Sequence, residues 1–225
     1  MKILVALIAA CAFVALLKKP LRAHPGIFYA SAAALDVLLL AGNLSGVPVP
    51  LWASILSFHA RGLFGFALFA IVMFIGVLGD GSRLKSSLLP IRAELSILAS
   101  ILIAGHIANY LEIYCTRLLS LNIGTLSAEA SLVVACAATA LLVPLAITSV
   151  KAVKKRMSAR SWKRLQRFAY LFWGLAYAHL ALILLQPARS NGAEALTSLV
   201  IYSIIFAVYT AARIRRWRID ARQKH

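Results

Sequence analysis

The sequence predicts an all-α membrane protein, a polytopic bundle of about seven transmembrane helices. Of its 225 residues, 62% are hydrophobic and only 14% are charged, and the mean hydropathy is +0.86, which is far from the balance of a soluble domain. Apolar segments that approach the roughly 20 residues of a membrane span recur along the whole chain. Lys and Arg collect in alternate connections between these segments, which is the pattern of a protein with several spans.

Seven segments are expected to cross the membrane, and the shortest is the first. Lys18 and Lys19 follow that first segment directly, which suits an uncleaved anchor better than a signal peptide. The stretch from 42 to 50 is uncharged and rich in turn residues, as an outer loop can be. In chain order the segments are 3–17, 27–44, 58–78, 91–114, 126–150, 165–185 and 195–212.

The basic residues predict the orientation of the bundle. Most of the 24 Lys and Arg residues lie after the first segment, before the fourth, between the fifth and sixth, and in the C-terminal tail. Seven spans with the N-terminus outside and the C-terminus inside place all these connections on the cytoplasmic side, where short loops retain Lys and Arg. An even number of spans would break the alternation. The basic loops that give the chain its net charge of +17 would then face anionic lipid. Nucleic acid is therefore not expected as a partner.

Motifs for soluble chemistry are missing from the sequence. No connection is long enough for a nucleotide-binding domain, and no GxGxxG, GxxxxGK[ST] or HExxH occurs. The three cysteines, Cys11, Cys115 and Cys136, lack CxxC or CxxCH spacing, which argues against a disulfide framework, a zinc site or covalent heme attachment. Any chemistry is therefore expected inside the bundle or on a partner.

Two histidines lie deep inside apolar segments. His106 follows Arg92 at nearly the same spacing as His179 follows Arg167, which puts both roughly 18 to 21 Å from the cytoplasmic boundary of a core about 30 Å thick. An ionisable group at that depth is costly and marks a candidate site. Small residues flank both histidines, and they leave room either for a flat macrocycle or for close helix packing. Spacing and depth alone do not decide between these two interpretations.

Part of the chain resembles a known family. LAITS at 145–149, the basic loop after it and SWKRLQRFAYLFWGLAYAH at 161–179 resemble the ferric reductase-like transmembrane domain. The resemblance is strongest to the branch with the heme-binding membrane subunit of the methionine sulfoxide reductase system. The spacing from Arg92 to His106 and the segment RGLFGFALFAIVMFIGVLGDGSRLK also match. We therefore divide the chain into a two-helix extension (1–56), a heme-binding transmembrane domain (57–212) and a basic cytoplasmic tail (213–225).

The resemblance implies a bundle that binds b-type heme and passes electrons across the membrane. His106 and His179 would be the axial ligands of an outer heme. Where relatives usually carry another histidine, this chain has Gln166, so a single heme is expected. An inner quinone or flavin site near Arg92, Gln166 and Arg167 would supply the electrons.

Four further residues are weaker candidates. Arg61 and Arg117 lie near span ends, where they could pair with heme propionates, although ordinary interfacial anchoring is at least as good an interpretation. His59, at the outer start of the third segment, is expected to be solvated rather than a ligand. Asp36 lies inside the second segment, where burying an unpaired carboxylate costs free energy. We therefore favour the interpretation that Asp36 is paired with a group on another helix over the interpretation that it relays protons.

The sequence thus predicts a multi-pass protein of a bacterial plasma membrane that serves as the electron-transfer component of an oxidoreductase system. Its expected partners are the lipid bilayer, an inner quinol or flavin donor, and an extracytoplasmic redox partner protein. The alternatives are a small proton-coupled transporter that uses Asp36, His59 and the deep histidines, and a heme-free membrane scaffold. No internal repeat or pair of broken helices supports the transporter.

Overall fold

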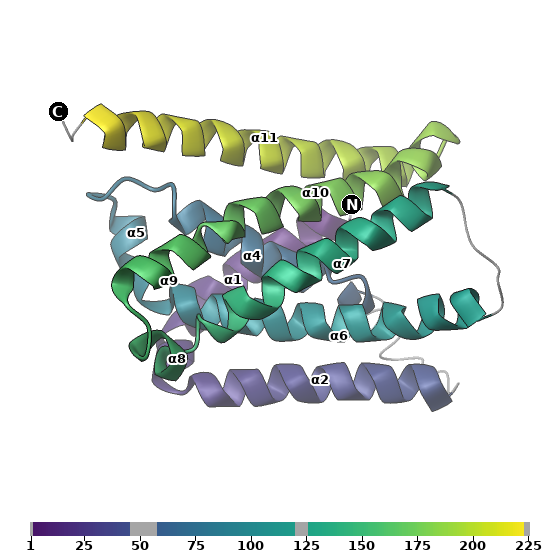
Figure 1. Ribbon diagram of the computed structural model, residues 1–225, viewed down its shortest axis with the longest axis horizontal. Coiled ribbons are helices and arrows are strands. Elements are labelled where there is room, and N and C mark those ends of the chain that lie inside the picture. Colours follow the sequence, from purple (N-terminus) through teal and green to yellow (C-terminus); the bar gives the residue numbers. More distant parts are fainter. Residues whose placement is uncertain (1, 46–57, 120–125, 223–225) are drawn as a thin grey trace.

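A computed structural model describes residues 2–45, 58–119 and 126–222, and this part of the chain consists of helices and short connections, without strands (Figure 1). A short helical turn at 58–60 precedes α4. The other helices are α1 (Lys2–Ala23), α2 (Pro25–Ser45), α4 (Leu63–Ile75), α5 (Arg83–Leu88), the 3-10 turn η1 (Leu89–Ile91), α6 (Arg92–Leu119), α7 (Leu126–Ile147), α8 (Lys151–Lys155), α9 (Ala159–Gln166), α10 (Phe168–Arg189) and α11 (Ala193–Arg222).

The chain is a multi-pass membrane protein. In the described residues, six helical stretches are long and apolar enough to cross a membrane: α1, α2, the run from α5 to α6, α7, the run from α9 to α10, and α11. The seventh expected span, 58–78, contains the shorter apolar helix α4, which has 13 residues. It is shorter because Gly62 adopts a left-handed φ of 66° before the helix, and the chain leaves the helix at Gly76.

The short helix α4 forms the centre of the bundle. Nearly all its residues are buried, as expected of a helix that is hydrophobic on every side. It packs on α1 and α6, and its aromatic rings reach the C-terminal helices. Phe66 stacks on Trp173 of α10 with ring centroids 5.3 Å apart, and Trp173 stacks on Phe206 of α11 at 4.4 Å. These aromatic contacts join α4, α10 and α11 into one core.

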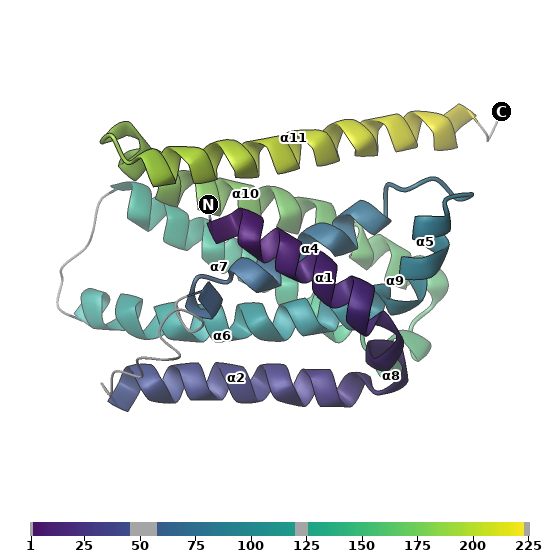
Figure 2. The same ribbon diagram turned by 180° about the vertical axis from the view of Figure 1, so that it is seen from behind.

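The longer helices surround α4 and run along the length of the molecule. α2 packs on α6, while α10 packs on α7 and α11. In both views α2 and α11 lie at opposite sides of the bundle (Figures 1 and 2). Large apolar side chains such as Ile8 on α1, Val37 on α2 and Val133 on α7 are exposed, as expected of surfaces that face lipid.

The basic connections gather at one end of the bundle, together with α5, α8, α9 and the C-terminal end of α11 (Figures 1 and 2). There the exposed Lys151 places its Nζ 2.7 Å from Oε1 of Glu94, a carboxylate that is 2% exposed at the start of α6. The contact is an ion pair without hydrogen-bond geometry, because neither carboxylate oxygen accepts a hydrogen bond. This end is the predicted cytoplasmic face, and the orientation itself stays a prediction.

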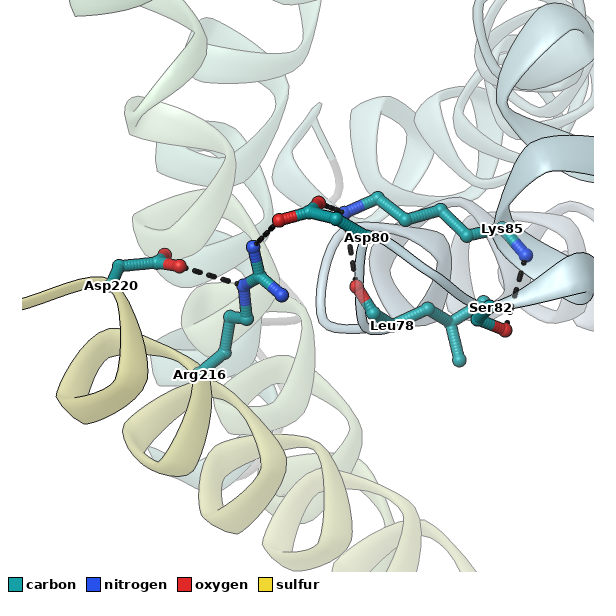
Figure 3. A network of polar contacts seen from close by, with 6 residues as sticks. All are labelled: Leu78, Asp80, Ser82, Lys85, Arg216 and Asp220. Atoms are coloured by element: carbon teal, nitrogen blue, oxygen red, sulfur yellow. Dashed lines mark hydrogen bonds and ion pairs between the residues drawn. The ribbon is translucent and has the colours of Figure 1, made fainter. Parts of the chain in front are cut away.

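An ion cluster fastens α11 to the connection between α4 and α5 (Figure 3). Asp80 accepts a hydrogen bond from Lys85 Nζ at 2.7 Å and another from Arg216 of α11, and Arg216 Nε also donates to Asp220 at 2.9 Å. The hydrogen bonds from Lys85 and Arg216 lower the pKa of Asp80 to about 2. Residues 213–222 of the expected tail therefore continue α11 as an anchored helix.

Candidate cofactor site at two deep histidines

His106 on α6 faces the turn that precedes α4. Its Nδ1 lies 2.6 Å from the carbonyl oxygen of Ala60. Because a carbonyl only accepts, Nδ1 carries the hydrogen and donates it. The neutral ring then keeps a lone pair on Nε2, which is the arrangement of a histidine that ligates a metal.

Two glycines allow α4 to approach α6 closely enough for this contact. A β-carbon at Gly62 would lie 3.1 Å from Cγ of His106, and one at Gly65 would lie 2.9 Å from Cγ1 of Ile103. A larger residue at either position would push the two helices apart. Sequence reasoning missed this role, although the paired glycines in RGLFGF are its visible signal.

His179 on α10 is held in the same way by α7. Its Nδ1 lies 2.9 Å from Oγ and 3.1 Å from the carbonyl oxygen of Ser131, a residue that is 0% exposed. The carbonyl can only accept, so its contact is a hydrogen bond when Nδ1 carries the hydrogen, and Nε2 then keeps its lone pair. The hydroxyl of Ser131 can either donate or accept. Sequence reasoning missed Ser131 as well, because a serine inside an apolar helix has no distinctive pattern.

The two histidines provide a donor set that a heme could use. Each ring is half-buried and uses Nδ1 for a hydrogen bond within the protein. In the described part of the chain, no group of three or more His, Cys, Asp or Glu side chains could hold a bare metal ion. A porphyrin supplies four nitrogens of its own and needs only two ligands from the protein. The donor set therefore suits a heme better than an isolated ion.

Asp36 and His59 form a buried pair beside this site. Oδ1 of Asp36 on α2 lies 2.6 Å from Nε2 of His59, which is 4% exposed. The expectation that His59 is an ordinary solvated residue was therefore wrong, because α2 covers it and supplies its partner. The interpretation of Asp36 as a satisfied interhelical group is the one that this contact supports.

Asp36 also lies directly against the helix that carries His106. A β-carbon at Gly105 would overlap the Asp36 carboxylate and lie 2.9 Å from its Cβ. The residue next to His106 in the chain is therefore a glycine at a point where α2 and α6 approach closely. Asp36, His59 and His106 thus gather where α2, α6 and the turn before α4 meet.

The inner candidates do not all lie together. Arg92 donates from Nε to the carbonyl of Val72 at 3.2 Å, near the C-terminal end of α4. Gln166 donates to Thr148 Oγ1 at 3.1 Å, so its amide joins α9 to the end of α7. Arg167 is exposed. It lines a groove of about 420 Å³ together with Arg164, Phe168, Tyr170 and Leu171.

The two outer arginines have different positions. Arg61 is exposed in the turn before α4, one residue after the carbonyl that His106 uses. Arg117 belongs to α6, but its side chain lies outside the described residues. Whether either arginine pairs with a propionate stays a prediction.

Comparison with known proteins identifies a family and a relative. The family model for the ferric reductase like transmembrane component matches residues 61–177, a range that includes His106 and stops just before His179. A protein of Treponema pallidum (strain Nichols), described as uncharacterized, is 36% identical over 222 residues. The alignment covers 96% of this chain and 61% of that relative, so the chain spans less than two thirds of its length. No solved structure matches the chain.

Proposed function

The chain belongs to the ferric reductase-like transmembrane family, and we propose that it carries electrons across the membrane through a single heme b. The observation that carries this proposal is the matched pair of deep histidines, His106 and His179, each with Nδ1 hydrogen-bonded to a backbone carbonyl and Nε2 available. His106 and His179 would hold the heme, which would supply one-electron transfer.

The surrounding residues orient the two ligands. The hydrogen bond to the carbonyl of Ala60 fixes the tautomer of His106 and raises the basicity of its Nε2, and the two contacts with Ser131 orient the ring of His179. These partners come from the turn before α4 and from α7, so four segments contribute to the site. The helix α4 contributes only apolar side chains to the centre of the bundle.

One heme is proposed rather than two because of Gln166. Its amide already donates to Thr148 Oγ1, and an amide is not among the usual axial ligands of heme iron. Electrons would instead enter at the inner end from a quinol or a flavin near Arg92 and the groove at Arg167. Guanidinium groups can bind the oxygen atoms of either donor.

The acceptor would be an extracytoplasmic redox protein on the outer side. Because these 225 residues contain no nucleotide-binding motif, we propose that they relay electrons between a donor and an acceptor at the two faces of the membrane. We therefore propose that the chain is the electron-transfer component of an oxidoreductase system.

The rival proposal is proton-coupled transport, and the buried pair of Asp36 and His59 is the observation that favours it. Paired ionisable groups inside a membrane often line a proton path. Heme content separates the two proposals, because a transporter of this kind needs none.

The test is heme quantification, together with a reduced-minus-oxidised absorption spectrum, on protein expressed with ample heme. We expect a b-type spectrum and about one heme per chain in the wild type, lost in His106→Ala and in His179→Ala, because each variant removes one axial ligand. His24→Ala, at an exposed connection outside the site, is the matched control and should keep its heme. About two hemes per chain would contradict the single site, and a heme-free wild type would contradict the whole proposal.

A further inference from the structure

We propose that Asp36 is a positioning residue for His106, acting through His59 and the turn between His59 and Gly62. This inference rests on the proposed function, because it concerns the orientation of a heme ligand. Three successive contacts connect these residues, and they lead from α2 to α6.

The first contact joins Asp36 to His59. The carboxylate accepts from Nε2–H at 2.6 Å, and the two side chains are 14% and 5% exposed. Inside a membrane a broken hydrogen bond has no water to replace it, so both partners strongly favour staying together. Asp36 therefore fixes where the His59 side chain lies.

The second contact transmits this position along the backbone. The amide of Gly62 donates to the carbonyl of His59 at 2.8 Å, and the amide of Phe66 donates to the carbonyl of Gly62 at 2.9 Å. The turn from 59 to 62 is thus continuous with α4 and short enough to move as one unit. The carbonyl of Ala60 lies within this turn, so its direction follows from the position of His59.

The third contact reaches the ligand. The carbonyl of Ala60 accepts from His106 Nδ1–H at 2.6 Å, and in the described part of the chain this is the only hydrogen bond of that ring. Without it, the imidazole would exchange between its two tautomers. The form with hydrogen on Nε2 would present an N–H where a ligand needs a lone pair.

Asp36 also sets the spacing on the other side of His106. Its carboxylate lies against Gly105 of α6 and also accepts the hydrogen bond from His59. Asp36 therefore fixes the position of α2 relative to both α6 and the turn before α4. Asp36 and His59 both precede residue 61, where the family match begins. We infer that the segment before the matched region contributes to the site by orienting one of its ligands.

The test uses heme-free protein with ¹⁵N-labelled histidine, because nitrogen chemical shifts distinguish the two imidazole tautomers. His→Gln variants assign the signals. We expect His106 to be Nδ1-protonated in the wild type and in Asp36→Asn, whose amide oxygen still accepts from His59. We expect Asp36→Ala to populate both tautomers. Leu39→Ala, at a buried position on the same helix, is the packing control and should lower stability without changing the tautomer.

A second variant covers the case in which Asp36→Ala does not fold. His59→Phe keeps a flat aromatic ring at this position and removes the same hydrogen bond, so it should release His106 in the same way. An unchanged His106 tautomer in whichever of the two variants folds overturns the positioning role.

The heme-loaded protein gives an independent measurement. The midpoint potential and the low-spin electron paramagnetic resonance signal should shift in Asp36→Ala and stay close to wild type in Asp36→Asn and Leu39→Ala, because they respond to the orientation and basicity of the axial imidazole. If the wild type binds no heme, the proposed function is wrong. The tautomer experiment on the heme-free protein would still decide whether Asp36 positions His106.

Discussion

At the scale of single residues, the deep ionisable groups were predictable and their partners were not. His106, His179 and Asp36 are identifiable because a charged or titratable side chain is costly inside an apolar segment. Their partners are a backbone carbonyl at Ala60, a serine in an apolar helix at 131, and a histidine on another element at 59. A carbonyl exists at every position, so no sequence pattern shows which one a distant helix will use.

The close approach at Gly105 leads to a prediction about stability. Gly105→Ala places a β-carbon in the space of the Asp36 carboxylate, so α2 and α6 must separate. We expect a loss of about 1–3 kcal/mol in the free energy of unfolding, which is the usual cost of overpacking. Denaturant titration of the protein in detergent micelles would measure it.

Gly174→Ala is the matched control for this prediction. A β-carbon at Gly174, in the interior of α10, meets no atom within 4 Å. The substitution should therefore be neutral or stabilise the helix by about 0.5–1 kcal/mol, because alanine is the better helix former. Equal stability of the two variants would show that α2 does not press on α6 at Gly105.

At the scale of elements, hydropathy located the apolar segments but misjudged one helix. The segment 58–78 has enough apolar residues for a span, yet its helix covers only Leu63–Ile75. A hydropathy window counts apolar residues and does not detect the left-handed backbone at Gly62 that separates the first turn. Because the turn before Gly62 is separate from α4, the carbonyl of Ala60 can accept a hydrogen bond from His106. A prediction that treats 58–78 as one continuous helix therefore misses this part of the site.

The ion cluster between two elements predicts a pH dependence. The pKa of Asp80 is lowered in the folded protein to about 2, below the roughly 3.9 of an unfolded aspartate. Its contribution to stability is therefore complete above about pH 4 and is lost as the pH falls toward the folded value. Asp80→Asn should lower the unfolding temperature by the same amount at about pH 8 and about pH 5, and by less below about pH 4.

The control for the Asp80 prediction is Arg218→Gln on the same helix. Arg218 is exposed and takes no part in the contacts of Figure 3, so this variant should unfold at the wild-type temperature. A difference between wild type and Asp80→Asn that changes between about pH 8 and about pH 5 would argue against a strongly acidic Asp80.

At the scale of the whole molecule, the alternation of basic connections predicts the orientation in the membrane. The cluster of α5, α8, α9 and the end of α11 should face the cytoplasm. In a variant without native cysteines, Ser158→Cys, between α8 and α9, should react with a membrane-impermeant maleimide only after the inner face is exposed. Ser190→Cys, between α10 and α11, should react in intact cells. The reverse pattern would invert the predicted topology.

The helical class and the apolar segments were thus accessible from composition alone, because the bilayer imposes both the length and the hydrophobicity of a span. The central position of α4 was not, since α4 is buried among helices from both ends of the chain. Hydropathy does not distinguish a helix surrounded by protein from one surrounded by lipid.

The contact between Asp36 and Gly105 also limits how this protein can change over evolutionary time. A side chain larger than glycine at position 105 leaves no room for the acid at position 36, and the loss of that acid leaves His59 buried without its partner. Each single step passes through a destabilised intermediate, so the three positions are expected to change together or to stay as they are. Among homologous sequences, the pair 36 and 105 should covary, although the residues lie on different helices.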